Sequence, residues 1–300
     1  MFSIVGILIV FGAVLAGFLM EKGPLLVLVQ PSEFVIIAGA AIGTMITANP
    51  LHVLKKIVAS LTRVIGGSKY SRQRYVDCLR MMYQLFNKAR KDGMVGIEVD
   101  IEDPEKSPVF SKFTDFLKNH HARDFVCDTM RMAITGGATP FDLDQMMELD
   151  MDVHHAGASQ PASALSTVAD SLPGMGIVAA VLGVVVTMSA LGGPPEEIGH
   201  KVAAALVGTF LGILLCYGIV GPLASNLTKL VDDEHAYYHV LRVVMLSFIK
   251  GMSPTLAIEV ARRAVPEHVR PSFKEVEQAC RQRDDAAAPA GAPAAATSAA

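Results

Sequence analysis

The 300-residue sequence has no tryptophan and only four cysteines, Cys78, Cys127, Cys216 and Cys280. The cysteines stand far apart, without a CxxC pair or another metal-ligand spacing, so the sequence indicates neither a disulfide framework nor a zinc site. We expect four free thiols. The formal net charge of −3 is small, and no basic run carries interleaved aromatic residues. These two features exclude a nucleic-acid-binding surface.

Signatures of catalysis are also absent. The chain has no glycine-rich phosphate loop, no HExxH motif, and no serine or cysteine nucleophile with a base in the same polar region. Two pairs of adjacent histidines occur, His120 with His121 and His154 with His155. Adjacent residues point to different faces of a helix, so neither pair can chelate a metal well. We therefore predict a protein that is not an enzyme and that binds no metal and no cofactor.

Charged residues make up only 18% of the chain, below the roughly 25% of soluble domains, whereas hydrophobic residues make up 51%. A helix needs about 20 predominantly apolar residues to cross a hydrocarbon core of about 30 Å. Four stretches meet this requirement and are predicted as transmembrane helices: 1–20, 34–54, 166–193 and 200–228. The first has no basic leading region, and its apolar run is too long for a signal peptide, so we expect it to be retained.

Positive charges predict the orientation of these helices. Of the 26 lysines and arginines, 15 lie in residues 51–165 and nine in residues 225–300. The two others are Lys22 and Lys201. Because Lys and Arg near membrane ends stay in the cytoplasm, we predict that both termini are cytoplasmic.

Residues 55–165 read as a helical cytoplasmic domain. Apolar residues recur at helical spacing from Ser71 until Gly93 ends the run, and two shorter amphipathic helices follow. Thr139 and Pro140 then open a long helix, since a cap hydroxyl precedes a proline at its first position.

Residues 229–284 are predicted to form further cytoplasmic helices, with a restart at Ser253. The Ala/Pro-rich residues 285–300 are expected to be disordered. No strand pattern competes with these helices. The predicted fold class is an all-α polytopic membrane protein, with four transmembrane helices and a large helical cytoplasmic domain.

The third span opens with "ADSLPG", which places Asp170 and Pro173 on one helical face. An acid within a span tends to mark an ion path, although an acid at the membrane boundary can also simply be hydrated. Pro173 and Pro222 each remove a backbone donor, which indicates at least a structural kink. Gly208 and Gly212 place small residues one turn apart, which allows close helix packing.

Three segments together resemble the MotA family of flagellar motor stator subunits: "LFNKARKDGMVGIE", "ADSLPGMGIVAAVLGVV" and "VGTFLGILLCYGIVGPLA". The resemblance covers nearly all of residues 1–285. It implies a bacterial inner-membrane subunit that forms a ring, thought to be a pentamer, around two MotB-like single-span partners anchored to peptidoglycan. It also implies that the unit conducts ions and pushes on a FliG-like rotor switch complex. The essential ion-carrying carboxylate would belong to the partner.

The resemblance also implies roles for particular residues. Asp170, Pro173 and Pro222 match positions of the proton pathway and of its coupling to the cytoplasmic domain. Arg90 and Glu98 match the rotor-facing charges, although the residues alone favour an ordinary solvated surface. Exposed charges of this kind would steer a complementary partner weakly and in a salt-dependent way.

The ion is predicted to be a proton. A sodium site must replace the water shell of the cation with several oxygen ligands, whereas a proton needs a carboxylate and a hydrated route. Sodium-driven relatives of the family carry a threonine seven residues after the matching proline, where this chain has Ala180. Thr209 keeps a hydroxyl that would face the conduit. One hydroxyl is a poor cage for sodium.

Two alternatives stay open. An energiser of the ExbB/TolQ type also couples a proton gradient through a partner helix, but that family normally has three spans, and it lacks the segment around Arg90 and Glu98. A conventional transporter or a membrane scaffold is the other possibility. No inverted internal repeat supports a transporter.

Overall fold

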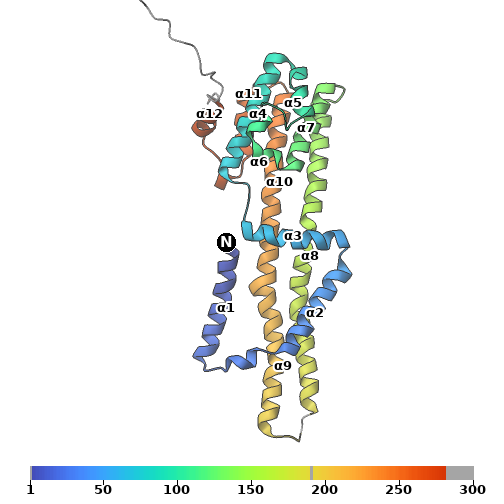
Figure 1. Ribbon diagram of the computed structural model, residues 1–300, viewed down its shortest axis with the longest axis vertical. Helices are drawn as coiled ribbons and strands as arrows, with labels where there is room; N and C mark the ends of the chain where they lie inside the picture. The colour runs from blue at the N-terminus through green and yellow to red at the C-terminus, as the bar shows by residue number, and fades with distance from the viewer. Residues whose placement is uncertain (1, 190–191, 282–300) are drawn as a thin grey trace, which may run out of the picture. The chain divides into compact units, whose positions relative to one another are not determined.

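The computed structural model describes residues 2–189 and 192–281, and every regular element in these ranges is helical. The chain divides into two compact units. The first unit comprises Met1–Lys69 and Asp150–His235, and the second comprises Tyr70–Leu149 and Ala236–Ala300. Two long helices, α8 (Pro140–Met188) and α10 (Gly221–Ile249), contribute residues to both units (Figure 1).

Within the described ranges, four helical stretches are long and apolar enough to cross a membrane, which confirms the predicted fold class. The stretches are Ser3–Met20, Leu25–Ala48, Pro140–Met188 and Pro195–Ile249. The first three stretches correspond to α1 (Phe2–Met20), to α2 (Pro31–Ala48) with the residues just before it, and to α8; the fourth runs from α9 (Pro195–Leu215) through α10. Residues 190 and 191 of the expected third span, and the tail expected to be disordered, lie outside the described residues.

The limits of the second apolar helix differ from the predicted residues 34–54. It begins at Pro31 and ends at Ala48, and a new helix, α3 (Leu51–Gly66), starts after Pro50. Proline lacks a backbone N–H and disfavours helical backbone in the residue before it, so the chain breaks there. Figure 1 shows α3 running across the first-unit parts of α8 and α10.

The prolines inside α8 do not end that helix, which runs through both Pro161 and Pro173. The path from α9 to α10 is also helical throughout, because the π-helical stretch η4 (Cys216–Val220) joins them. Pro222 follows η4 within the first turn of α10. A π-helical turn rearranges the backbone hydrogen bonds, so it accommodates the proline that follows.

Helices α8 and α9 pack closely against each other at glycine residues. A Cβ added to Gly212 would lie 2.6 Å from the carbonyl oxygen of Leu172 and 2.9 Å from the Cα of Gly176. A Cβ on Gly176 would lie 2.8 Å from the carbonyl oxygen of Gly208. Real side-chain carbons do not approach this closely, so the Gly208 and Gly212 pair serves helix packing within this chain. Gly39 has open space around it.

The second unit has its core along α4 (Arg72–Asp92). The Ser71 hydroxyl caps this helix by accepting from the backbone N–H of Arg74, and Gly93 ends it with a φ of 80°. Leu85 and Phe86 are completely buried, and the Phe86 ring stacks on that of Phe248 with 4.0 Å between centroids. The unit therefore has a well-packed core of its own.

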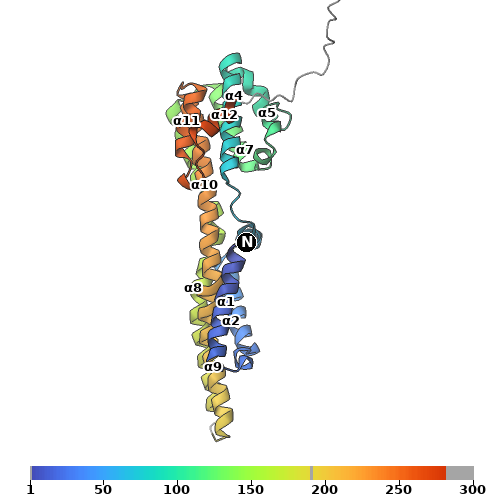
Figure 2. The ribbon, with the colours of Figure 1, turned by 90° about the vertical axis from the view of Figure 1, so that its left-hand side faces the viewer.

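The remaining elements have 3 to 16 residues. They are η1 (Leu25–Leu28) in the first unit and, in the second, η2 (Met94–Ile97), α5 (Glu98–Glu102), η3 (Phe110–Lys112), α6 (Thr114–Leu117), α7 (His120–Thr135), α11 (Pro254–Ala264), η5 (Glu267–Val269) and α12 (Phe273–Arg281). Figure 2 shows α11 and α12 near α4. The Ser253 hydroxyl caps α11, at the position where the sequence indicates a restart.

Candidate functional site

Three of the expected pathway residues lie on α8. Asp170 and Pro173 are three positions apart, and Ala180 follows seven positions later, spacings that place residues on one side of a helix. The helix is continuous over this stretch, so the spacing holds. Asp170 is exposed, whereas Pro173 and Ala180 are half-buried. The structure therefore brings these three residues onto one side of α8.

Thr209 of α9 lies beside the same part of α8. Its Cα is 3.3 Å from the position that a Cβ on Gly176 would occupy, and Gly176 lies between Pro173 and Ala180 in the sequence. Thr209 is half-buried. The close packing of the glycines is what allows Thr209 to approach α8.

Pro222 does not join this group. It lies thirteen residues beyond Thr209 along a continuous helical path, which corresponds to about 20 Å of helical rise. Pro222 is also exposed. Any effect of Pro222 on the group must therefore act through the helix itself.

Arg90 and Glu98 are both exposed in the second unit. Arg90 lies in the last turn of α4 and Glu98 is the first residue of α5, where the helix dipoles favour a cation and an anion, respectively. Neither side chain forms an ion pair within the part of the chain that the structure describes. Both charges are therefore available to a partner.

A buried ion pair that the sequence analysis missed holds the segment of Glu98 against α4. Asp100 is 0% exposed, and its carboxylate accepts hydrogen bonds from Lys88 Nζ at 2.7 Å and from Ser107 Oγ at 2.6 Å. The signal was present, because Ile97 and Ile101 flank this acid at helical spacing and both are buried. An acid between two core residues has to find a partner.

A second group that the sequence did not indicate is Glu33, which directly precedes the predicted span of residues 34–54. The structure places it in the first turn of α2, only 5% exposed. Its Oε2 atom is buried and has no hydrogen-bond partner among the described residues. A Cβ on Gly208 of α9 would lie 2.5 Å from this oxygen. The carboxyl group thus rests directly on the α9 backbone.

A third missed group joins α3 to α10 in the first unit. Glu234 is 8% exposed, and its Oε2 accepts a hydrogen bond from Arg63 Nη2 at 2.9 Å. His154 Nε2 of α8 lies 3.7 Å from the other carboxylate oxygen. Glu234 therefore links three helices where α3 crosses them.

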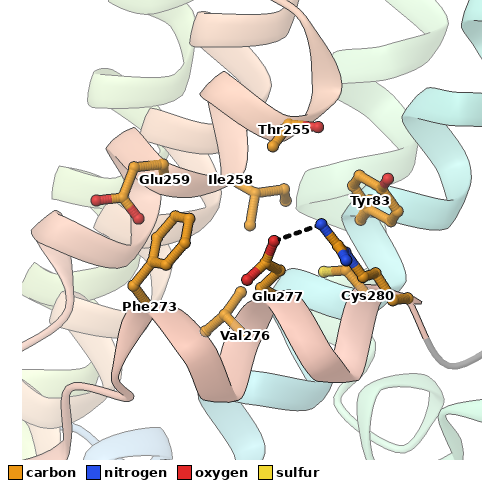
Figure 3. A pocket seen from close by; sticks show the side chains of 9 residues that line it. Tyr83, Thr255, Ile258, Glu259, Phe273, Val276, Glu277 and Cys280 are labelled. Carbon is orange, nitrogen blue, oxygen red and sulfur yellow. Dashed lines mark hydrogen bonds and ion pairs between the residues drawn. The ribbon is translucent and has the colours of Figure 1, made fainter.

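The second unit also contains a small pocket, shown in Figure 3, between α4, α11 and α12. Its volume is about 190 Å³, below the roughly 300–1,000 Å³ typical of ligand pockets. Hydrogen bonds from Arg262 and Arg263 lower the pKa of Glu259 at its rim to about 2. Burial raises the pKa of Cys280 to about 11, which keeps this thiol protonated. The pocket provides packing and ion pairing, and we assign no ligand to it.

The four cysteines are free thiols, as predicted. The described residues contain no cluster of three or more His, Cys, Asp or Glu side chains able to hold a metal ion.

Two family models match the chain. The model described as "Motility protein A N-terminal" matches residues 4–93, and "MotA/TolQ/ExbB proton channel family" matches residues 117–239. The protein named "Motility protein A" from Escherichia coli is 39% identical over 278 residues, covering 93% of this chain and 94% of the relative. "Chemotaxis protein LafT" from Vibrio parahaemolyticus is 32% identical, covering 91% and 96%, respectively.

Solved structures share the fold. The MotAB structure from C. jejuni has a TM-score of 0.75 at 19% identity, covering 90% of this chain and 98% of that chain. The flagellar MotAB stator complex from Bacillus subtilis has a TM-score of 0.70 at 23% identity, covering 92% and 98%. Together with the relatives above, these findings show that the chain belongs to the Motility protein A family, within the MotA/TolQ/ExbB proton channel family.

Proposed function

We propose that this chain is a stator subunit of the bacterial flagellar motor. With a MotB-like, single-span, peptidoglycan-binding partner it forms a proton-conducting unit in the inner membrane, and this unit converts proton flow into torque on a FliG-like rotor switch complex. The observation that carries the proposal is the similarity to "Motility protein A", at 39% identity over nearly the whole chain. We further propose a multi-pass topology with both termini in the cytoplasm and a ring of five subunits.

The transported ion in this proposal is a proton. Ala180 has no hydroxyl. Among the proposed pathway residues on α8 and α9, Thr209 is therefore the one that carries a hydroxyl group. A sodium ion needs several oxygen ligands in place of its water shell, whereas a proton relay needs only a carboxyl group and water. The partner supplies the essential carboxyl group. The chain itself lines the path and couples it to the second unit.

Arg90 and Glu98 are the proposed contact with the rotor. Both are exposed, and the segment of Glu98 is held to α4, which carries Arg90, by the buried pair of Asp100 and Lys88. Exposed opposite charges attract complementary charges weakly per pair, so a rotor can bind and release them repeatedly. No catalytic role is required of any residue in this account.

The alternative is an energiser of the ExbB/TolQ type, because one matched family model includes those proteins. The match of residues 4–93 to the N-terminal model of Motility protein A favours the motor instead.

Co-purification tests the proposal. The full chain, extracted from native membranes with a mild detergent, should bring down a single-span protein with a periplasmic peptidoglycan-binding domain. Reversing both Arg90 and Glu98 should leave this complex intact and impair rotation, since both side chains are exposed. Loss of the partner from the wild-type preparation, or normal swimming of the doubly reversed strain, would count against the assignment.

The proposed coupling through α8 and α10 has its own test. Pro173→Ala and Pro222→Ala should each preserve assembly with the partner and reduce rotation, because each restores a backbone N–H to a helix that connects the pathway to the second unit. Normal rotation in both strains would mean that these prolines are only structural.

A further inference from the structure

Glu33 is the one titratable residue between Lys22 and His52, and only 5% of its surface is exposed. It lies where three helices of the first unit meet. A Cβ on Gly208 of α9 would lie 2.5 Å from Glu33 Oε2 and 3.1 Å from the Cβ of Ala179 on α8. The Glu33 carboxyl therefore fills the space above the Gly208 backbone, beside Ala179.

Among the described residues packed near Glu33, no side chain carries a positive charge. Helix α2 packs on α9, which also packs on η1, and Ala179 of α8 lies beside Glu33 at Gly208. The sequences of η1, of residues 202–215 in α9 and of residues 171–189 in α8 contain no titratable or charged side chain. The titratable residues of α9 lie in its first two turns, Glu196, Glu197, His200 and Lys201, and Lys201 pairs with Glu197 at 3.0 Å. Glu33 Oε2 also has no hydrogen-bond partner among the described residues.

An ionised carboxylate in such a place would be strongly unfavourable. Burial of an unpaired charge costs several kcal/mol even after relaxation, far more than burial of the neutral acid. The packed arrangement of α2 on α9 therefore requires that Glu33 carries a proton. Release of that proton requires water, or a polar group of another chain, to reach the carboxyl group.

The place of Glu33 connects it to the proposed pathway. Gly208 precedes Thr209 on α9, and Ala179 precedes Ala180 on α8. The buried acid thus lies one residue away from a pathway residue on each of two helices. Ionisable residues inside a membrane protein commonly mark ion paths.

We propose that Glu33 is a proton-binding site of this chain, which takes up and releases a proton of the transported flow as α2 closes on and parts from α9. The statement that this proton belongs to the transported protons rests on the proposed function. The statement that Glu33 is protonated does not. An acid in the first turn of a helix also interacts favourably with the helix dipole, which is the purely structural role that the test has to separate.

Carbodiimide labelling tests the proton directly. A hydrophobic carbodiimide reacts with protonated carboxyl groups: the acid proton moves to a carbodiimide nitrogen, and the carboxyl oxygen bonds to the central carbon to give an O-acylisourea. In native membranes that contain the full chain and its partner, dicyclohexylcarbodiimide should label the Glu33 peptide, as read by mass spectrometry. A water-soluble carbodiimide should not label it, yet should label Glu197, whose side chain is 53% exposed on α9.

Swimming speed tests whether the proton is used. Glu33→Gln keeps the shape but cannot release a proton, so swimming should be lost, whereas Glu33→Asp should retain part of it and the control Glu197→Gln should swim normally. Membrane levels of each variant, measured by immunoblot, separate a functional loss from misfolding. If Glu33→Gln does not accumulate, the wild-type labelling decides the proposal alone.

Absence of label from wild-type Glu33, or normal swimming of Glu33→Gln, overturns the proposal and leaves Glu33 as a structural residue. Neither result affects the proposed function. That function fails on a different observation, the absence of a peptidoglycan-binding partner from the purified complex.

Discussion

Gly212→Ala should loosen the contact between α8 and α9. The new methyl group would lie 2.6 Å from the Leu172 carbonyl oxygen and 2.9 Å from the Gly176 Cα. Both are backbone atoms, so no side chain can rotate away and the helices themselves must separate. Overpacking of this kind typically costs about 1–3 kcal/mol. The higher helix propensity of alanine returns about 1 kcal/mol. Because the clash involves two backbone groups, the upper half of the overpacking range applies, about 2–3 kcal/mol, and the expected net loss is roughly 1–2 kcal/mol.

Gly39→Ala is the matched control, since a Cβ there meets no atom within 4 Å in this chain. This variant gains the helix propensity of alanine without a clash, so its free energy of unfolding should be unchanged or slightly higher. Thermal unfolding of the two purified variants, at equal detergent and protein concentration, gives the comparison. Each kcal/mol corresponds to a Tm shift of about 2–4 °C for a unit of 150–250 residues. An unchanged or raised Tm for Gly212→Ala would refute the close backbone contact.

Three further predictions concern ion pairs. Asp100→Asn should raise hydrogen exchange of residues 94–102 by weakening the buried bond to Lys88, at a cost of about 1–3 kcal/mol, whereas Asp103→Asn, in an exposed pair, should not. The folded pKa of Glu259, about 2, lies below its ordinary 4.5, so its stabilising contribution is present above pH 4.5 and lost as pH falls towards 2. In urea denaturation measured between pH 4.5 and pH 2, the free energy of unfolding of Glu259→Gln should therefore depend less on pH than that of the wild type. Glu234→Gln should destabilise the first unit, because Arg63 would lose its charged partner.

Local sequence signals predicted the limits of α4 and the first residues of α8 and α11. A serine cap before a run of periodic apolar residues, and a glycine after it, give the limits that the structure assigns to α4. These signals are reliable because they involve backbone groups only a few residues apart. The presence of four helical stretches long and apolar enough to cross a membrane was also predictable, since length and hydropathy alone define them among the described residues.

Groups that depend on contacts between distant segments could not be predicted. Glu33 reads as a loop residue before an apolar run, and only the packing of α2 on α9 shows that it is buried. Arg63 and Glu234 are separated by 171 positions, so no local pattern pairs them. The limit of α2 at Ala48 was missed although Pro50 signals it, because apolar composition continues past the break.

The central claim is that this chain drives rotation with protons. The most direct measurement is swimming speed as a function of external sodium at fixed pH, with and without a protonophore. The account predicts a speed that is independent of sodium and that falls to zero when the protonophore collapses the proton gradient. Swimming that stops on removal of sodium, yet persists in the presence of the protonophore, would contradict it.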